Sequence, residues 1–133
     1  MKNKASDYYK QGNSCSESII KAAVDAGLCD ESLLSVASAF SGGMSSGCLC
    51  GAVAGSQMVL GHNFGKRNSK NNQEIARQKA KEFIEEFKKN RKATCCKVLT
   101  AGLDPVQRKQ NCTSLVEECA QILEKMIKLN TSS

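Results

Sequence analysis

The sequence predicts an all-α fold, with residues 1–133 forming a single-domain bundle of about five to six helices. Apolar residues recur three and four positions apart along most of the chain, which is the spacing of one helix face. Aromatic residues make up only 5% of the chain and proline occurs once, so the core is expected to consist of aliphatic side chains. A chain of 133 residues is long enough to bury such a core without disulfides.

The first helices are predicted from local start and stop signals in the sequence. A short amphipathic segment ends at Gly12. Ser14 and Glu17 then have the spacing of a capping box, in which each side chain accepts a hydrogen bond from the other residue's backbone. This pair predicts a helix that begins at Cys15 and ends at Gly27.

The middle of the chain predicts two further helices separated by a glycine loop. Asp30 is expected to cap a helix whose apolar positions point inward. These positions are Leu33, Leu34, Ala37 and Phe40. The next helix, from about Cys50 to His62, is small or apolar on nearly all sides and is expected to be the most buried one. Gly51 and Gly55 lie four residues apart, so another backbone could approach this helix closely.

The second half of the chain predicts three helices. A cap within residues 71–74 should begin a long helix with an apolar stripe that ends at Phe87. A short helix is expected to begin at Thr94 and end at Gly102. The last helix is predicted from about Cys112 to Leu129. Its apolar face comprises Leu115, Val116, Cys119, Ile122, Leu123, Met126 and Ile127.

The positive charge of the chain is confined to one segment. Residues 66–92 carry ten basic and four acidic side chains, which accounts for the whole net charge of +6. Such a face is usually solvated surface, and it could also dock an acidic protein. No aromatic residues alternate with the basic ones, which argues against nucleic-acid binding.

The cysteine content suggests metal or redox chemistry. Eight cysteines are more than packing requires in a chain of this length. The N-terminal residues are charged and are not followed by an apolar stretch, so the sequence predicts neither a signal peptide nor a membrane span. We therefore expect a cytoplasmic protein, in whose reducing environment clustered cysteines more often bind metals or exchange electrons than form structural disulfides.

Four of the cysteines share a position relative to the predicted helices. Cys15, Cys50, Cys96 and Cys112 each fall at or just before a predicted helix start. There the free amide groups and the helix dipole favour a thiolate, so the pKa of each of these thiols is expected to be lowered. If the four converge in space, they form a cage of thiolates.

The glycine loop before Cys50 is predicted to bind an anion. Gly42, Gly43 and Gly47 tolerate positive φ, so successive amide groups could turn toward one centre. Together with Gly51, Gly42 and Gly43 are the predicted cofactor-binding glycines.

The residues around these cysteines resemble a known family. Residues 50–55 read Cys-Gly-Ala-Val-Ala-Gly, and the chain is similar over about residues 5–124 to the C-GCAxxG-C-C family of redox-active proteins. Five further segments also resemble the family pattern. They are residues 12–17, 41–44, 58–61 and 96–99, and Cys112 with Val116 and Ala120. The resemblance implies a redox role, and its pattern favours Cys50 over Cys48 and Cys96 over Cys95 as the working thiols.

Several functions remain open from the sequence. Cys15, Cys50, Cys96 and Cys112 could ligate an iron-sulfur cluster for electron transfer or sensing. Alternatively, Cys50 and Cys15 could act as the redox thiols of a thiol-disulfide oxidoreductase, without a metal. The same four thiols would also suit a structural zinc ion. In a fourth interpretation all eight cysteines are inert in a helical binding module.

The remaining expectations concern the other cysteines and the partners. Cys48 or Cys95 could serve as a resolving thiol, whereas Cys29 and Cys119 are expected to be buried packing residues. An unidentified electron donor or acceptor protein is the expected partner. A homodimer could form through the small-residue face of the helix that begins at about Cys50.

Overall fold

The computed structural model describes residues 1–65 and 74–131 and confirms the all-α prediction. In this part of the chain the α-helices are α1 (Lys2–Lys10), α2 (Cys15–Asp25), α3 (Leu33–Ala37), α4 (Gly51–Phe64), α5 (Glu74–Arg91), α6 (Cys96–Leu99) and α7 (Pro105–Thr131). A single 3₁₀ turn, Ser38–Phe40, continues α3. No strand occurs in the described ranges. Among their helices, none is both long enough and apolar enough to cross a membrane.

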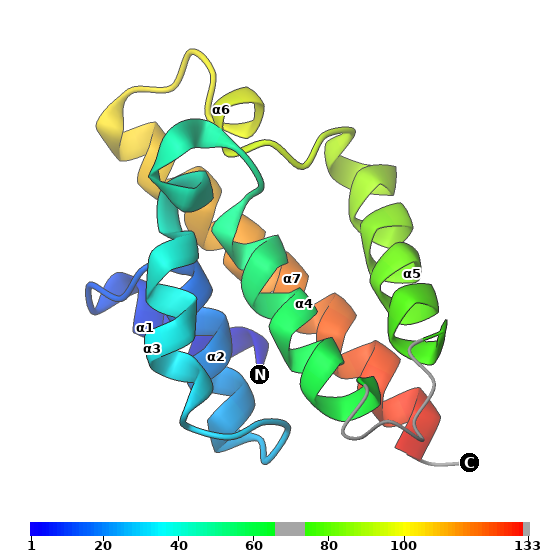
Figure 1. Cartoon of the computed structure of the whole chain (residues 1–133). Coiled ribbons are helices and arrows are strands. Elements are labelled where there is room, and N and C mark those ends of the chain that lie inside the picture. Colours follow the sequence, from blue (N-terminus) through cyan, green and yellow to red (C-terminus); the bar gives the residue numbers. More distant parts are fainter. Residues whose placement is uncertain (66–73, 132–133) are drawn as a thin grey trace.

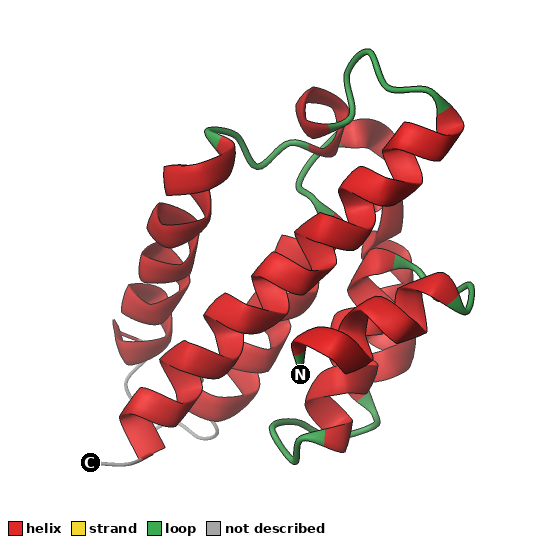
Figure 2. Cartoon of the chain, turned by 180° about the vertical axis from the view of Figure 1, so that it is seen from behind, coloured by secondary structure: helices red, strands yellow, loops and turns green. Residues whose placement is uncertain are grey.

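Helix α4 lies at the centre of the bundle, as its apolar sequence predicts. It packs against α2, α5 and α7, and Figure 1 shows it between α2 and α5 with α7 behind. From the opposite side, Figure 2 shows the long α7 in front, with α1 packed against it. The side chains of Val53, Val59 and Leu60 on α4 are at most 1% exposed. The core therefore surrounds this one helix.

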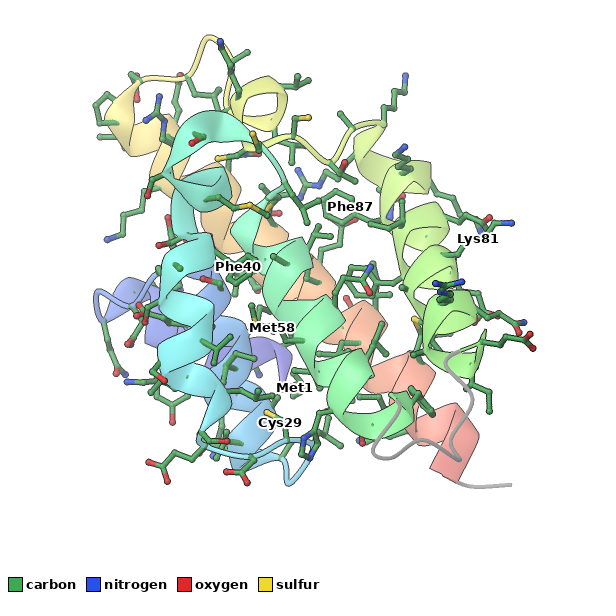
Figure 3. The ribbon with its side chains drawn as sticks, viewed as in Figure 1. Met1, Cys29, Phe40, Met58, Lys81 and Phe87 are labelled. Carbon is green, nitrogen blue, oxygen red and sulfur yellow. The ribbon has the colours of Figure 1, made fainter. Side chains whose placement is uncertain are left out.

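The apolar stripes of α5 and α7 face this core. Phe83 and Phe87 of α5 are fully buried, and Figure 3 shows Phe87 pointing into the bundle while Lys81 points away from it. On α7 the predicted face is confirmed, with Ile122 and Met126 only partly buried at its margin. The fully or almost fully buried residues of that face are Leu115, Val116, Cys119, Leu123 and Ile127.

Helices α2 and α4 approach each other closely because α4 carries glycines at the contact. A methyl group added at Gly55 would lie 3.0 Å from the Ser16 carbonyl oxygen of α2. The predicted close approach to Gly51 and Gly55 is thus made by α2 of the same chain. Because α2 already covers this small-residue face, the face is not open to a second copy. The oligomeric state itself stays a prediction.

The start of α2 is the predicted capping box. The Ser14 Oγ accepts a hydrogen bond from the Glu17 amide, and the Glu17 carboxylate accepts one from the Ser14 amide. The other carboxylate oxygen of Glu17 accepts a bond of 2.6 Å from the Ser38 hydroxyl. These bonds hold the pKa of Glu17 below its usual value, the Ser38 bond most strongly. They also fix the segment after α3 to the end of α2 that carries Cys15.

Two predicted helix starts are wrong. Asp30 does not cap α3, because its carboxylate accepts from the Ser32 amide and forms a turn before the helix. Of the four apolar residues expected to point inward there, only Ala37 is fully buried.

The last helix begins seven residues before Cys112, at Pro105. Asp104 and Gln107 exchange backbone-to-side-chain hydrogen bonds at this point, and proline suits the first helical position because it needs no amide partner there. Residues 71–73 of the cap predicted within residues 71–74 lie outside the described residues, and Glu74 is the first residue of α5.

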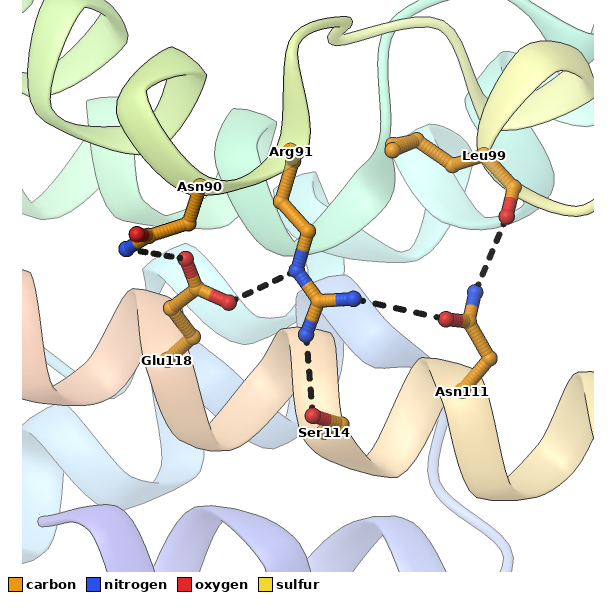
Figure 4. A network of polar contacts seen from close by, with 6 residues as sticks. All are labelled: Asn90, Arg91, Leu99, Asn111, Ser114 and Glu118. Atoms are coloured by element: carbon orange, nitrogen blue, oxygen red, sulfur yellow. Dashed lines mark hydrogen bonds and ion pairs between the residues drawn. The ribbon is translucent and has the colours of Figure 1, made fainter.

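A polar network joins the end of α5 to α6 and α7 (Figure 4). Arg91 Nε donates to Glu118 at 2.7 Å, and its other guanidinium nitrogens donate to Ser114 and Asn111. The side-chain amide of Asn111 in turn donates to the Leu99 carbonyl of α6 at 3.0 Å. The network thus fixes α6, and with it Cys96, to α7.

Replacing Arg91 tests this network. The Arg91 and Glu118 side chains are only 22% and 19% exposed, so R91A leaves a largely buried carboxylate without its charged partner. We expect the free energy of unfolding, measured by urea denaturation, to fall by about 2 kcal/mol. Lys89 pairs with Glu86 on the exposed surface of the same helix, so K89A should cost well under about 1 kcal/mol. Equal losses in the two variants would contradict this role of Arg91.

Candidate cysteine redox site

One cavity brings together cysteines that lie far apart in the sequence. It has a volume of about 500 Å³, and three of the four predicted site cysteines line it. Cys15 is the first residue of α2, Cys96 is the first residue of α6, and Cys112 lies inside α7. The predicted convergence is therefore seen for these three thiols.

The fourth cysteine, Cys50, lies behind the cavity wall rather than on it. It is only 4% exposed at the N-terminal end of α4, and charges on Cys15 and Cys96 would both act on it electrostatically. A methyl group at the adjacent Gly51 would be 2.5 Å from the Cys15 sulfur. Cys15 thus packs directly against the turn that carries Cys50, and glycine at position 51 leaves the room for its sulfur.

A short antiparallel pairing holds Cys50 near Cys96. Leu49 pairs with Cys95 as an isolated bridge. The Cys50 amide donates to the Thr94 carbonyl at 2.7 Å, and the Cys96 amide donates to the Cys48 carbonyl. This pairing is not predictable from the sequence, because such a short bridge between segments over forty residues apart has no local signal.

The glycine loop adopts a left-handed turn beside the cysteines. Gly42, Gly43, Met44 and Ser45 all have φ between 56° and 63°. L-residues disfavour this region, so Met44 and Ser45 are held there by the surrounding structure. A methyl group at Gly43 would lie 2.6 Å from the Cys48 nitrogen and 2.8 Å from the Cys96 Cβ. The loop therefore packs against the pairing, while anion binding by its amides stays a prediction.

Three further residues of the cavity were not singled out from the sequence. Tyr9 and Cys112 both line the cavity, and the Tyr9 hydroxyl lowers the pKa of the Cys112 thiol against the effect of burial. Lys97 and Arg108 also line the cavity, and the positive charge of Arg108 acts on both Cys96 and Cys112. Each of the three is an ordinary surface-type residue in sequence, so only the fold reveals its place.

A family comparison agrees with this arrangement. The family described as "Putative redox-active protein (C_GCAxxG_C_C)" matches residues 13–126, which include all four site cysteines. The chain belongs to the C_GCAxxG_C_C family. Comparison with curated proteins and with solved structures finds no match.

The C_GCAxxG_C_C signature has a physical basis in this fold. Its first glycine, Gly51, leaves room for the Cys15 sulfur, and its last, Gly55, lets α2 pack closely on α4. The signature therefore places Cys50 beside Cys15 and seats the helix behind both.

The predicted lowering of the thiol pKa values is wrong for three of the site cysteines in this C_GCAxxG_C_C protein. Burial raises the pKa of Cys50 to about 11, although the amides of Val53 and Ala52 act in the opposite direction. Burial is also the largest cause of the raised pKa values of Cys96 and Cys112. Cys112 lacks a helix-start environment altogether, since it lies well inside α7. Desolvation of the thiolate thus outweighs the helix ends.

The other four cysteines of this family member divide by exposure. Cys119 is fully buried in the core, as predicted, and Cys29 is partly buried and donates weakly to the Ile20 carbonyl. Cys48 and Cys95 are exposed. All eight thiols are unpaired in the structure.

These differences predict an order of alkylation. In a short iodoacetamide pulse near neutral pH on the folded protein, Cys48 and Cys95 should react first because their side chains are exposed. Burial raises the pKa of Cys29 to about 11, so its labelling should be slow and should accelerate as the pH rises. Cys119 should react only after unfolding. Mass spectrometry of the labelled peptides gives the order, and early labelling of Cys119 would contradict the packing described here.

Proposed function

We propose that Cys15, Cys50, Cys96 and Cys112 ligate an iron-sulfur cluster and that the protein carries or senses electrons through it. The observation that supports this most is that Cys15, Cys96 and Cys112 line one cavity beside two cationic side chains, while Cys50 lies buried close behind them. Cysteine thiolates are the usual ligands of such clusters. The family description as redox-active supports the same class of function.

A single zinc ion and a cluster require different spacings of the thiol ligands. A tetrahedral zinc site needs four ligands at about 2.3 Å from one centre. Within residues 1–65 and 74–131, no three cysteine, histidine or carboxylate side chains are close enough to hold one ion. In a cluster different thiolates bind different irons, so its ligands stand farther apart.

The protonation of the thiols supports a cluster over free thiol-disulfide exchange. A reactive thiol needs an appreciable thiolate fraction at neutral pH, whereas burial raises the pKa of Cys50, one of the two candidate redox thiols, to about 11. Iron binding would displace the thiol protons, because metal ligation favours the thiolate strongly. Buried thiols that ionise only on binding suit a metal centre.

The chain's own residues would shape such a centre in three ways. Arg108 and Lys97 place positive charge beside the cavity, which offsets the negative charge of the thiolates. The Tyr9 hydroxyl would donate a hydrogen bond to the Cys112 sulfur, and hydrogen bonds to the sulfur ligands raise the reduction potential of a cluster. The burial of Cys50 keeps water from one side. When bound, the cluster would supply one-electron transfer.

A disulfide between Cys15 and Cys50 is the second candidate. It is supported by the position of the Cys15 sulfur against Gly51, next in sequence to Cys50. In that case the protein would be a metal-free thiol-disulfide oxidoreductase that exchanges electron pairs with an unidentified partner. The cytoplasmic location predicted from the sequence would suit the cluster, because a reducing environment keeps the ligand cysteines from forming disulfides.

The deciding experiment is anaerobic purification with metal and sulfide analysis, including reconstitution of metal-free protein with ferrous iron and sulfide. We expect a brown protein that contains iron together with acid-labile sulfide and whose visible absorption bleaches on reduction. A colourless protein that takes up no iron and loses two thiols on mild oxidation would overturn the cluster in favour of the disulfide. Zinc in equimolar amount would overturn both.

A further inference from the structure

Cys48 lies beside the proposed site without belonging to it. It is exposed, it stands two residues before Cys50, and the cavity lining does not include it. Its backbone, however, is bonded directly to the site, because its carbonyl accepts the Cys96 amide. A residue with an exposed thiol is thus hydrogen-bonded through its backbone to a cysteine that lines the cavity.

The backbone pairing places Cys48 opposite Cys96. Leu49 and Cys95 form an isolated antiparallel bridge, and its two hydrogen bonds join the flanking residues, Cys96 with Cys48 and Cys50 with Thr94. Directly opposed residues in such a pair have Cα atoms about 5.5 Å apart and side chains on the same face. Disulfides most often join Cα atoms about 5.5–6 Å apart.

A second contact supports this proximity. A methyl group at Gly43 would lie 2.6 Å from the Cys48 nitrogen and 2.8 Å from the Cys96 Cβ. The Cys48 backbone and the Cys96 side chain are therefore neighbours on the same side of the glycine loop. Cys95, by contrast, is paired with Leu49 and its side chain lies on the opposite face from that of Cys48.

We propose that Cys48 and Cys96 form a disulfide when the protein meets a small-molecule disulfide. The oxidation site would lie next to the Leu49–Cys95 bridge, on the side where the Cys48 thiol is exposed. Cys48 is the entry point because it is the exposed member of the pair, whereas Cys96 is partly buried.

The chemistry is two successive thiol-disulfide exchanges. The Cys48 thiolate attacks one sulfur of the small disulfide, which forms a mixed disulfide and releases one small thiol. The Cys96 thiolate then attacks the Cys48 sulfur, which closes the Cys48–Cys96 bond and releases the second small thiol. The two cysteines lose two electrons and two protons, and the small disulfide gains both.

The consequence for the metal centre rests on the proposed function. A Cys96 sulfur held in a disulfide cannot ligate iron, so oxidation at Cys48 would remove one of the four ligands. The cluster would then be released under oxidising conditions and could be rebuilt after reduction by thiols. Cys48 would make the site sensitive to the thiol-disulfide balance around the protein.

The test uses the full chain in metal-free form and oxidised glutathione as the probe. After treatment, remaining thiols are blocked, the protein is digested with trypsin without reduction, and crosslinked peptides are identified by mass spectrometry. We expect a link between the peptide that contains Cys48 and the peptide that contains Cys96. The link should persist in C95S and C50S and vanish in C48S and C96S.

The controls separate this proposal from the proposed function. Because Cys48 and Cys95 are exposed, C48S and C95S should keep the circular dichroism spectrum of the unchanged protein, even if C96S fails to fold. Persistence of the link in C48S, or glutathione adducts alone, would overturn the disulfide. Iron-loaded C48S should keep its iron longer than the unchanged protein during glutathione oxidation, and equal loss would overturn the regulatory role. If no variant binds iron but the link forms, the cluster fails and the oxidation site stands.

Discussion

Gly43→Ala is expected to lower the free energy of unfolding by about 3 kcal/mol. Gly43 has a φ of +62°, where any L-residue is strained, and the added methyl would lie 2.6 Å from the Cys48 nitrogen and 2.8 Å from its carbonyl oxygen. Backbone atoms cannot move away as a flexible side chain can, so the loop and the Leu49–Cys95 pairing must shift. Urea denaturation of the metal-free protein measures the loss.

The neighbouring glycine supplies a matched control. Gly42 has nearly the same φ, +63°, but a methyl group there would meet nothing within 4 Å. Gly42→Ala should therefore cost only the conformational strain, about 1–2 kcal/mol. Gly61 is helical and equally unobstructed, so Gly61→Ala should stabilise the protein by about 0.5–1 kcal/mol. If Gly43→Ala and Gly42→Ala were equally destabilised, the tight packing of the loop on Cys48 would be refuted.

Cys50→Ser and Cys96→Ser are expected to abolish stable iron binding. Each would remove one of four proposed thiolate ligands, and a serine oxygen is a poor replacement for iron that prefers sulfur. The measurement is iron and acid-labile sulfide per chain after anaerobic reconstitution, with the visible spectrum as a second readout.

Each of these two cysteines has an exposed neighbour that serves as a control. Cys48→Ser and Cys95→Ser make the same replacement of sulfur by oxygen in the same two segments, but neither residue is a proposed ligand. Both variants should bind as much iron as the unchanged protein. Iron loss in Cys95→Ser with retention in Cys96→Ser would show that the wrong member of the pair had been assigned.

The fold was predictable where its signals are local. The capping box of Ser14 and Glu17 was confirmed as the start of α2, because both partners lie within one helical turn. The central position of α4 was confirmed because a helix that is small and apolar all round has no face for water. The predicted start of α7 near Cys112 was wrong. The helix begins at Pro105, where the Asp104 carboxylate accepts a hydrogen bond from the Gln107 amide.

The site was predictable only in part. The hypothesis that Cys15, Cys50, Cys96 and Cys112 converge came from their predicted positions at helix starts, and Cys15, Cys96 and Cys112 do line one cavity. Their protonation was not anticipated, since the position of a residue in a helix does not reveal how much of its side chain the fold buries. Tyr9 and Arg108 were missed for the same reason: they reach the cavity through packing of α1 and α7, which leaves no trace in short-range spacing.

The placement of Cys112 on the last helix constrains when the site can exist during synthesis. The ribosome releases Cys15 and Cys50 long before α7, and the cavity has no wall on that side until the final helix has docked. A chain that is truncated within α7, or still attached to the ribosome there, would expose reduced thiols instead of a finished centre. Metal loading of the proposed site would therefore have to follow the synthesis and docking of α7.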